Sequence, residues 1–387
     1  MNYNHPNKHS STISIRLMCA IVFLLFSFCW LFFFQAEVLA MTQHVLSGGV
    51  THYNPILGTL IICCGLMALQ MLIYSFIRLK QRFHAMTYLP SMLILAILTN
   101  VSLEVDGDND HAISWWLYIT ILVLWLVLII VARIYQELEE DDSYHLFSRP
   151  MWVNMLLMAL MMMGVAWMGN TNAVFHYRMK AENSLLKGDF DGALEVGKMS
   201  LESDENLMMI RMYAMARKDS LGDCLFKYPI TGNSSQILPT DSLSRVMLYP
   251  TDSIYRFLGA RPAKRMPPVH YLEILQRRDS VPHKVVNDYL LCSYLIDRDL
   301  DRFAKAIRKY YEVSDSLPLP RHYREALILY THLRSQPITV YHEPVMDEDY
   351  KNLKELEKQY PDYMERKGKV EDLYRGTYWY YYDYEKK

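Results

Sequence analysis

Long runs of apolar residues occupy the first 169 positions of the 387-residue chain, and charged residues are sparse among them. Five of these runs approach the roughly 20 residues that a helix needs to cross a bilayer. Backbone groups in hydrocarbon must be hydrogen-bonded within the protein, so each run is expected to form a helix. The sequence therefore predicts a transmembrane domain over residues 17–169, with spans at 17–34, 56–77, 89–103, 113–132 and 152–168. The third run is the shortest, and a re-entrant helix is an alternative for it.

The seven Lys and Arg residues of this part lie in the N-terminal tail, in the connection after the second span, or between the fourth and fifth spans. Basic connections of membrane proteins face the cytoplasm. We therefore expect residues 1–16 to form a cytoplasmic tail and residues 170–387 to lie beyond the membrane, which in a Gram-negative cell is the periplasm. The triplet ending at Ala40 is an acceptable signal-peptide cleavage site, but the first apolar run is longer than a usual signal core. An uncleaved, multi-pass protein of the inner membrane is the expectation.

After residue 170, apolar residues recur at helical spacing, and no alternating strand pattern of useful length appears. Residues 172–228 have the pattern of three helices separated by two turns. The turn that contains Gly188, Phe190 and Ala193 resembles the centre of a tetratricopeptide repeat. Glycine permits the tight turn, the aromatic ring fills the space between two antiparallel helices, and alanine lets them cross closely. We predict similar helix pairs at 283–314 and at 321–335 with 347–360.

Residues 229–268 contain 6 of the 16 prolines, which predicts irregular connections with short helices near 241–248 and 252–258. The aromatic run at 378–384 is interpreted as a cap on the last helix pair, because the ends of a solenoid must be covered. A carbohydrate-stacking platform is the alternative. The predicted fold class is all-α: a five-helix transmembrane bundle followed by a degenerate tetratricopeptide-like helical-hairpin solenoid over residues 170–387.

The density of charge divides the chain at the same boundary. Of the first 169 residues, 17 are Lys, Arg, Asp or Glu, against 65 of the remaining 218. The net charge is -2 and no strongly basic block exists, which argues against nucleic acid as a partner. Cys224 and Cys292 are the only cysteines after residue 170. Their spacing forms no recognisable framework, so a disulfide between them stays open.

No sequence motif of catalysis is present: the chain has no nucleophile elbow, phosphate loop, paired Cys-x-x-Cys or His-Glu-x-x-His. We predict no catalytic residue and no cofactor. One weak metal candidate is the outer loop with Asp106, Asp108 and His111, which begins like a calcium loop but lacks its glycine and its final glutamate. His44 and His52 of the other outer loop are the possible additional ligands. A membrane-associated enzyme with a metal site in these loops is therefore one alternative function.

Helical-pair repeats build extended surfaces that bind peptides or proteins. If the first pair follows the repeat geometry, Arg178 and Glu182 face the groove, and Asp288 does so in the second pair. The leading function is a membrane-anchored scaffold or binding protein for a protein or peptide partner, with membrane lipid around its spans. A second alternative is a structural subunit of a membrane complex, docked through polar residues of the spans. These polar residues are Gln70, Asn100 and Asn154.

Three stretches of the chain are similar to a known group of proteins, and the similarity as a whole covers most of the chain. The stretches are residues 43–51 after the first span, residues 188–194 and residues 221–229. With them, the chain resembles a poorly characterised group of Bacteroidota membrane proteins. Members of that group have several N-terminal spans and a tetratricopeptide-like C-terminal region. The resemblance implies an architecture and implies no activity.

Overall fold

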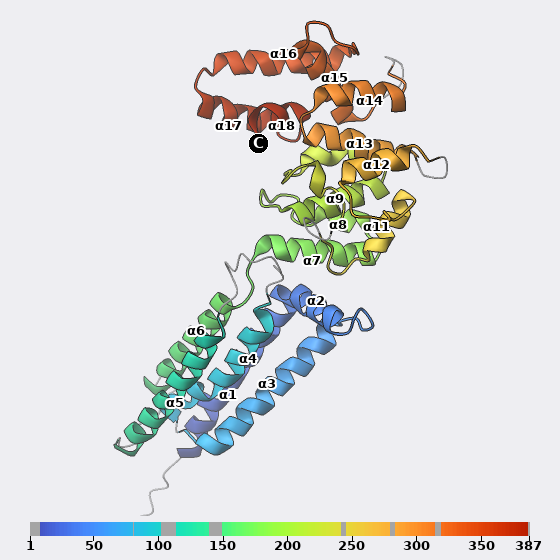
Figure 1. Cartoon of the computed structure of the whole chain (residues 1–387). Helices are drawn as coiled ribbons and strands as arrows, with labels where there is room; N and C mark the ends of the chain where they lie inside the picture. Colours follow the sequence, from blue (N-terminus) through green and yellow to red (C-terminus); the bar gives the residue numbers. More distant parts are fainter. Residues whose placement is uncertain are drawn as a thin grey trace, which may run out of the picture. The chain divides into compact units, whose positions relative to one another are not determined.

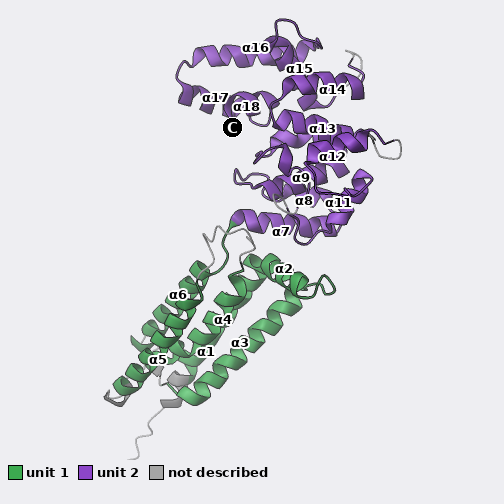
Figure 2. Ribbon diagram, viewed as in Figure 1, with its two compact units in different colours: residues 1–172 green, residues 173–387 purple. Residues whose placement is uncertain are grey.

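The computed structural model describes residues 8–79, 81–101, 114–138, 149–240, 245–278, 283–313 and 319–385. Within these ranges the chain is helical and has no β-strand, so the all-α class is confirmed. The internal contacts divide the chain into two compact units (Figure 2). Residues 1–172 form unit 1 and residues 173–387 form unit 2.

Unit 1 consists mainly of long helices that run alongside one another, with the short helix α2 lying across one end of them (Figure 1). They are α1 (Lys8–Cys29), continued by a π-helical turn (Trp30–Phe34), α2 (Ala36–Leu46), α3 (Pro55–Ile77), a 3₁₀ helix (Gln81–Tyr88) that leads into α4 (Leu89–Thr99), α5 (Trp115–Leu138) and α6 (Arg149–Met168). Five segments are long and apolar enough to cross a membrane, as predicted: Ile13–Phe34, Pro55–Ile77, Arg82–Thr99, Trp115–Tyr135 and Arg149–Met168. The third begins earlier than predicted because the 3₁₀ helix belongs to it. Helix α2 lies outside these segments and is not among the predicted elements.

Polar side chains of the spans form hydrogen bonds between helices of unit 1. The Nε2 atom of Gln70 donates to Oγ1 of Thr87 at 3.0 Å, and Nδ2 of Asn100 donates to the Tyr118 hydroxyl at 2.9 Å. The Oδ1 atom of Asn154 accepts from the backbone N–H of Ala85 at 2.7 Å. The sequence analysis suggests interhelical hydrogen bonds for these three residues as a way to dock other membrane proteins. In the structure their hydrogen-bond partners belong to the same chain.

Unit 2 is an assembly of shorter helices. They are α7 (Ala173–Leu186), α8 (Phe190–Glu195), α9 (Glu205–Arg217), α10 (Leu221–Cys224), α11 (Thr251–Leu258), α12 (Pro268–Gln276), α13 (His283–Ile296), α14 (Leu300–Tyr310), α15 (Arg321–Leu333), α16 (Pro344–Gln359), α17 (Tyr363–Tyr374) and α18 (Tyr378–Tyr384). Short 3₁₀ turns occur at Leu225–Lys227 and Ser234–Gln236. Most helices pack against their neighbours in the sequence, and in Figure 1 they follow one another from α7 to α16.

The predicted helix pairs are present as α7 with α8, α13 with α14, and α15 with α16. The predicted helix at 252–258 corresponds to α11, whereas α12 is not predicted. The predicted helix at 241–248 is wrong for residues 245–248, which are not helical, and its residues 241–244 lie outside the described residues. The physical reason is visible in the hydrogen bonds. The backbone N–H groups of residues 247–249 donate to the carboxylate of Glu182 instead of to helical carbonyls.

Helix α18 packs buried aromatic side chains against other parts of unit 2. The Tyr378 side chain is fully buried against Phe226, with ring centroids 5.0 Å apart, and Nε1 of Trp379 donates to the Glu325 carbonyl at 2.8 Å. The hydroxyl of Tyr381 donates to the Ile296 carbonyl at 2.6 Å. The rings of α18 are therefore in contact with α13, α15 and the 3₁₀ turn at Leu225–Lys227, and their burial does not suit a stacking platform, which needs exposed rings.

Candidate functional site

Arg178 and Glu182, predicted to face a groove, lie in the interior of unit 2. The Nε atom of Arg178 is 3.3 Å from Oε1 of Glu182, and its Nη2 atom donates to the carbonyl of Arg245 at 2.6 Å. The other oxygen of Glu182 accepts hydrogen bonds of 2.5–3.0 Å from the N–H groups of residues 247–249. Burial raises the pKa of this carboxyl, while Arg178 and the three N–H groups act in the opposite direction. The pair holds the segment before α11 onto α7.

Asp288, the third residue predicted to bind a partner, is also nearly enclosed. Its Oδ1 atom accepts hydrogen bonds from the hydroxyls of Tyr311 at 2.5 Å and Tyr323 at 2.9 Å. Burial raises the pKa of the Asp288 carboxyl. The thiol of Cys292 lies 3.6 Å from the Tyr323 hydroxyl. This cluster joins α13 to α15, and its 8% exposure leaves the carboxylate little room for a substrate.

The predicted repeat turn has the expected backbone, but the second helix is cut short. Gly188 has a φ of 73°, the left-handed region that glycine adopts without strain, and Ala193 is buried. The ring of Phe190 lies under the guanidinium of Arg217 at 4.8 Å. Helix α8 ends after six residues, and the buried Arg211 donates hydrogen bonds to the carbonyls of the next two residues, 196 and 197.

The metal candidates receive no support from the described residues. His44 lies in α2 and His52 follows it, while Asp106, Asp108 and His111 lie outside the described residues. No group of three His, Cys, Asp or Glu side chains suited to a metal ion occurs among the described residues.

The two cysteines of unit 2 do not form a disulfide in the structure. Cys292 is buried, and burial raises the pKa of its thiol, so it is a poor nucleophile. Cys224 is partly exposed, with the Lys227 ammonium 3.5 Å from its sulfur.

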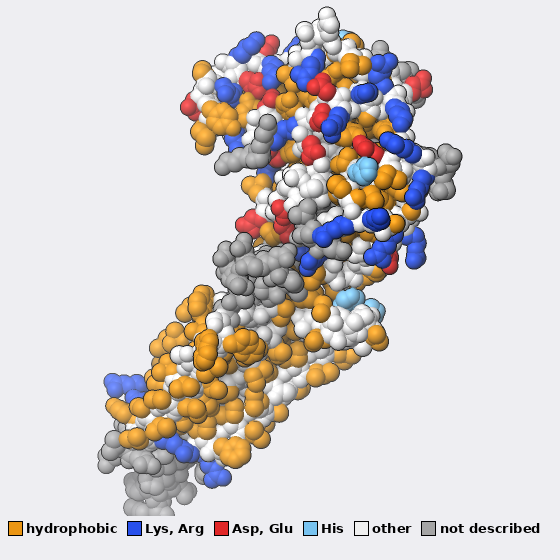
Figure 3. Space-filling view, viewed as in Figure 1, with side chains coloured by type: hydrophobic (Ala, Val, Ile, Leu, Met, Phe, Trp, Pro, Cys, Tyr) orange, Lys and Arg blue, Asp and Glu red, His pale blue; other side chains and the backbone are white. Residues whose placement is uncertain are grey.

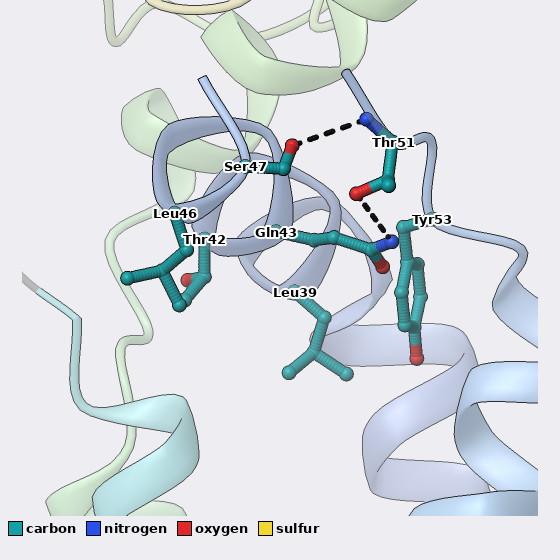
Figure 4. Close-up of a pocket in the computed structure, with 7 residues that line it drawn as sticks. All are labelled: Leu39, Thr42, Gln43, Leu46, Ser47, Thr51 and Tyr53. Carbon is teal, nitrogen blue, oxygen red and sulfur yellow. Dashed lines mark hydrogen bonds between the residues drawn. The ribbon is translucent and has the colours of Figure 1, made fainter. Parts of the chain in front are cut away.

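A hollow of about 400 Å³ lies on unit 1, between α2 and the segment that leads to α3 (Figure 4). Leu39 and the Tyr53 ring form its apolar side, and Gln43 donates a hydrogen bond to Thr51 across it at 3.0 Å. Ser47 accepts from the N–H of Thr51 at 3.2 Å. The lining contains no carboxylate, ammonium or imidazole, and its ionisable group is the Tyr53 phenol.

A buried polar network gives α15 a rigid position in unit 2. The N–H of Phe226 donates to Nε2 of His322 at 3.3 Å, so Nδ1 carries the proton and donates to Oε2 of Glu325 at 2.9 Å. That oxygen also accepts from the N–H of Tyr378 at 2.7 Å, and Nε of Arg321 reaches the other oxygen at 2.8 Å. Burial acts to raise the pKa of Glu325, but these donors outweigh it and leave the pKa below the ordinary value.

The connection from α15 to α16 is hydrogen-bonded to α14 and α15. The hydroxyl of Thr339 donates to the Ala304 carbonyl at 3.0 Å, and the N–H of Ile338 donates to the Tyr330 hydroxyl at 3.3 Å. Arg308 donates to the Ile338 carbonyl at 3.1 Å. Helices α14 and α15 therefore hold the first half of the connection in place.

Four aliphatic side chains of this connection face outward. Thr339 and Tyr341 are each only 5% exposed, whereas their neighbours Ile338 and Val340 are 59% and 57% exposed. Leu333, at the end of α15, and Val345, at the start of α16, are 46% and 73% exposed. We call Leu333, Ile338, Val340 and Val345 the aliphatic patch. It offers apolar contact on a fixed backbone and no group for catalysis.

The sequence analysis does not identify this patch, although one signal for it exists. The β-branched residues Ile338 and Val340 alternate with Thr339 and Tyr341 directly after Pro337. Alternation of this kind marks a segment with one face inward and one face outward. In a short connection between two helices, the pattern does not show which face is covered.

Comparison with known proteins gives one match. Residues 274–385 match the model of a family of unknown function (DUF6057). No curated protein and no solved structure matches the chain. The matched region contains Asp288, Glu325, the aliphatic patch and α18. Over this C-terminal region, the chain is similar to a family whose function is unknown.

Proposed function

We propose that the protein is a membrane-anchored binding protein, and that the aliphatic patch receives a protein or peptide partner. The observation that carries this proposal is the outward exposure of four aliphatic side chains on a connection held by α14 and α15. Exposed apolar residues cost free energy in water, and these four lie within 13 positions of one another in the sequence, which makes the connection a candidate interaction site. The partner is a segment with apolar side chains of its own.

The chemistry of the buried acids supports binding over catalysis. Glu182, Asp288 and Glu325 all accept hydrogen bonds from groups within unit 2, and their side chains are at most 8% exposed. A general acid or base must reach the proton that it transfers. These carboxylates fix helices instead.

The finer architecture and the location are parts of the same proposal. We infer that the helix pairs of unit 2 are degenerate tetratricopeptide-like repeats, as in the Bacteroidota membrane proteins that the sequence resembles. The N-terminus is cytoplasmic, the spans cross the inner membrane in contact with lipid, and unit 2 is periplasmic, because the basic residues of unit 1 lie in connections on one side. We fuse, after residue 387, a reporter that functions only in the periplasm. We expect this reporter to be active. Activity of a cytoplasm-specific reporter there would refute this orientation.

Site-specific crosslinking in intact membranes tests the proposed binding surface. A photoreactive residue in place of Val340 or Val345 is expected to capture the same protein in the full-length chain. The matched control places the photoreactive residue at Lys351, an exposed position of α16 outside the patch. Adding Ile338→Ser to the Val340 variant should weaken capture by about tenfold, the equivalent of about 1.4 kcal/mol. Capture of lipid alone, or equal capture at Lys351, would refute the proposal.

A further inference from the structure

Basic residues outnumber acidic residues in two segments of unit 2. Residues 245–278 and 300–310 contain eleven Lys and Arg against three Asp and Glu. The chain from residue 170 onward is almost balanced, with 33 basic and 32 acidic residues. In the view of Figure 3, Lys and Arg side chains gather over the part of unit 2 that contains α11, α12 and α14. We call this surface the basic face.

Six cations of the basic face are exposed and make no salt bridge with an acid of the described chain. They are Arg256, Lys264, Arg265, Arg277, Arg278 and Lys305. Of the three acids in these segments, Asp252 pairs with Arg261 at 2.7 Å and Asp301 pairs with Arg334 at 2.7 Å, while Glu273 accepts from the Tyr294 hydroxyl at 3.4 Å. The positive charge of the six cations is therefore not compensated by a salt bridge within the described part of unit 2.

Contacts between the helices make the basic face continuous. The hydroxyl of Tyr271 in α12 donates to the carbonyl of Ala260, which ties the loop containing Lys264 and Arg265 to α12. At the other end of α12, Oε1 of Gln276 accepts from Nζ of Lys309 in α14 at 3.0 Å. These two hydrogen bonds link the loop after α11, α12 and α14, and the cations lie on or beside these elements.

The basic face has no large apolar side chain in its exposed part. Among the described residues, no exposed large hydrophobic residue falls within 245–278 or 300–310. Single-stranded nucleic acid binds through exposed aromatic rings as well as charge, and protein interfaces depend on buried aromatic or aliphatic anchors. A positively charged surface that lacks such anchors suits a partner whose negative charge is spread over a broad area.

We propose that the basic face binds the headgroups of anionic phospholipids. The chain carries five apolar segments able to cross a membrane, so a bilayer is tethered to unit 2 and its effective concentration is high. Each Lys or Arg near an anionic bilayer contributes about 1 kcal/mol, within a screening length of about 8 Å at physiological salt. The inference uses a surface separate from the aliphatic patch, and it stands whether or not the patch binds a protein.

Amine labelling of the full-length chain in lipid nanodiscs tests this inference. Lys264 and Lys305 report on the basic face, and Lys351 and Lys358 of α16 serve as internal controls. Changing the lipid from phosphatidylcholine to a mixture with phosphatidylglycerol should slow labelling of Lys264 and Lys305 by at least about threefold. The control lysines should keep their rates. About 1 M salt, with a screening length of about 3 Å, should remove the protection.

Charge variants show whether the basic face itself causes the protection. Arg277→Glu with Arg278→Glu should abolish the protection of Lys264 and Lys305, and Arg277→Gln with Arg278→Gln should reduce it. Lys351→Glu with Lys358→Glu, a matched change on α16, should leave it intact. Unchanged helix content by circular dichroism shows that each variant is folded.

Several outcomes would overturn the inference. Equal labelling rates in the two lipids would show that anionic headgroups do not cover the face. Equal protection by free inorganic phosphate in phosphatidylcholine discs would assign the site to a soluble anion. Protection in native membranes but not in discs of purified lipid would assign it to a protein or nucleic acid partner.

Discussion

The two units bury polar side chains of different kinds. All buried Asp, Glu, Lys and Arg residues of the described chain lie in unit 2, namely Arg178, Glu182, Arg211, Asp288 and Glu325. Unit 1 buries amides and hydroxyls, such as those of Gln70 and Asn154, together with His84. Charge is costly to hold in hydrocarbon, whereas a water-surrounded unit can bury it if several donors or acceptors surround it. This difference in buried groups is consistent with the five segments of unit 1 that are long and apolar enough to cross a membrane.

The third span shows how neutral groups replace charges in unit 1. Its 3₁₀ segment leaves backbone groups outside a regular helix, and side chains from other spans reach them. Asn154 accepts from the N–H of Ala85 at 2.7 Å, and Nε1 of Trp125 donates to the Met86 carbonyl at 2.8 Å. Irregular backbone at membrane depth is tolerated where protein covers it and satisfies it.

The largest loss of stability is expected when a buried carboxylate of unit 2 is removed. Glu182→Ala leaves Arg178 and the N–H groups of residues 247–249 without their acceptor in the interior. We expect the free energy of unfolding of unit 2 to fall by about 3–5 kcal/mol, the cost of leaving a buried charge unpaired. Urea unfolding of the full-length chain, followed by circular dichroism, measures the change.

The matched control for this prediction is Glu195→Ala. Its carboxylate is exposed and pairs only with Lys198, so the variant should lose less than about 1 kcal/mol. If both variants lose the same amount, buried charge does not stabilise unit 2 in the way that the comparison requires.

A smaller loss of stability is expected when an uncharged hydrogen-bonding side chain between helices of unit 1 is removed. Asn154→Leu deprives the N–H of Ala85 of its acceptor within the membrane-spanning part. Hydrogen bonds between membrane helices contribute about 1–2 kcal/mol in model systems, so a loss of this size is expected. Unfolding by sodium dodecyl sulfate in mixed micelles measures it. Leu156→Ala, on the exposed side of the same helix, is the control and should change stability less. The reverse order would contradict the role assigned to Asn154.

The smallest effect concerns a charge at the edge of unit 2. Burial raises the pKa of Glu385 to about 6 from its usual 4.5. Between these values the folded chain holds the proton more tightly than the unfolded chain, so stability falls as the pH rises from 4.5 to 6. Glu385→Gln should remove this contribution and add about 1 kcal/mol at neutral pH, after allowance for partial screening.

Urea unfolding of the Glu385→Gln variant at several pH values measures the difference from the native chain. Asp372→Asn, at an exposed position, is the control. A native chain and variant with the same dependence on pH would show that Glu385 does not titrate differently in the folded state.

Periodicity predicts helices well where packing follows the local pattern. The pairs α13 with α14 and α15 with α16 follow from apolar spacing, and the five spans follow from run length. The segment before α11 is mispredicted as helix because its conformation depends on Glu182, about 65 residues away in the sequence. Helix α12 is missed because it begins at Pro268, inside a proline-rich stretch that otherwise suggests irregular structure.

The candidate surfaces are harder to predict from the sequence. Helical spacing assigns Arg178 and Asp288 to one side of a helix, but only the neighbouring segments decide whether that side is open or covered. The basic face is invisible in the net charge because acids elsewhere, many of them in α16 and α17, offset it. The aliphatic patch depends on a connection whose inner side is determined by Thr339 and Tyr341.

The hydrogen bond from Ala85 to Asn154 also constrains how the chain is made. The amide that satisfies the third span belongs to α6, which leaves the ribosome 69 residues later. Until that helix enters the bilayer, the 3₁₀ segment lacks its acceptor in the finished position. This hydrogen bond between the third and fifth spans can therefore form only after the fifth has been translated.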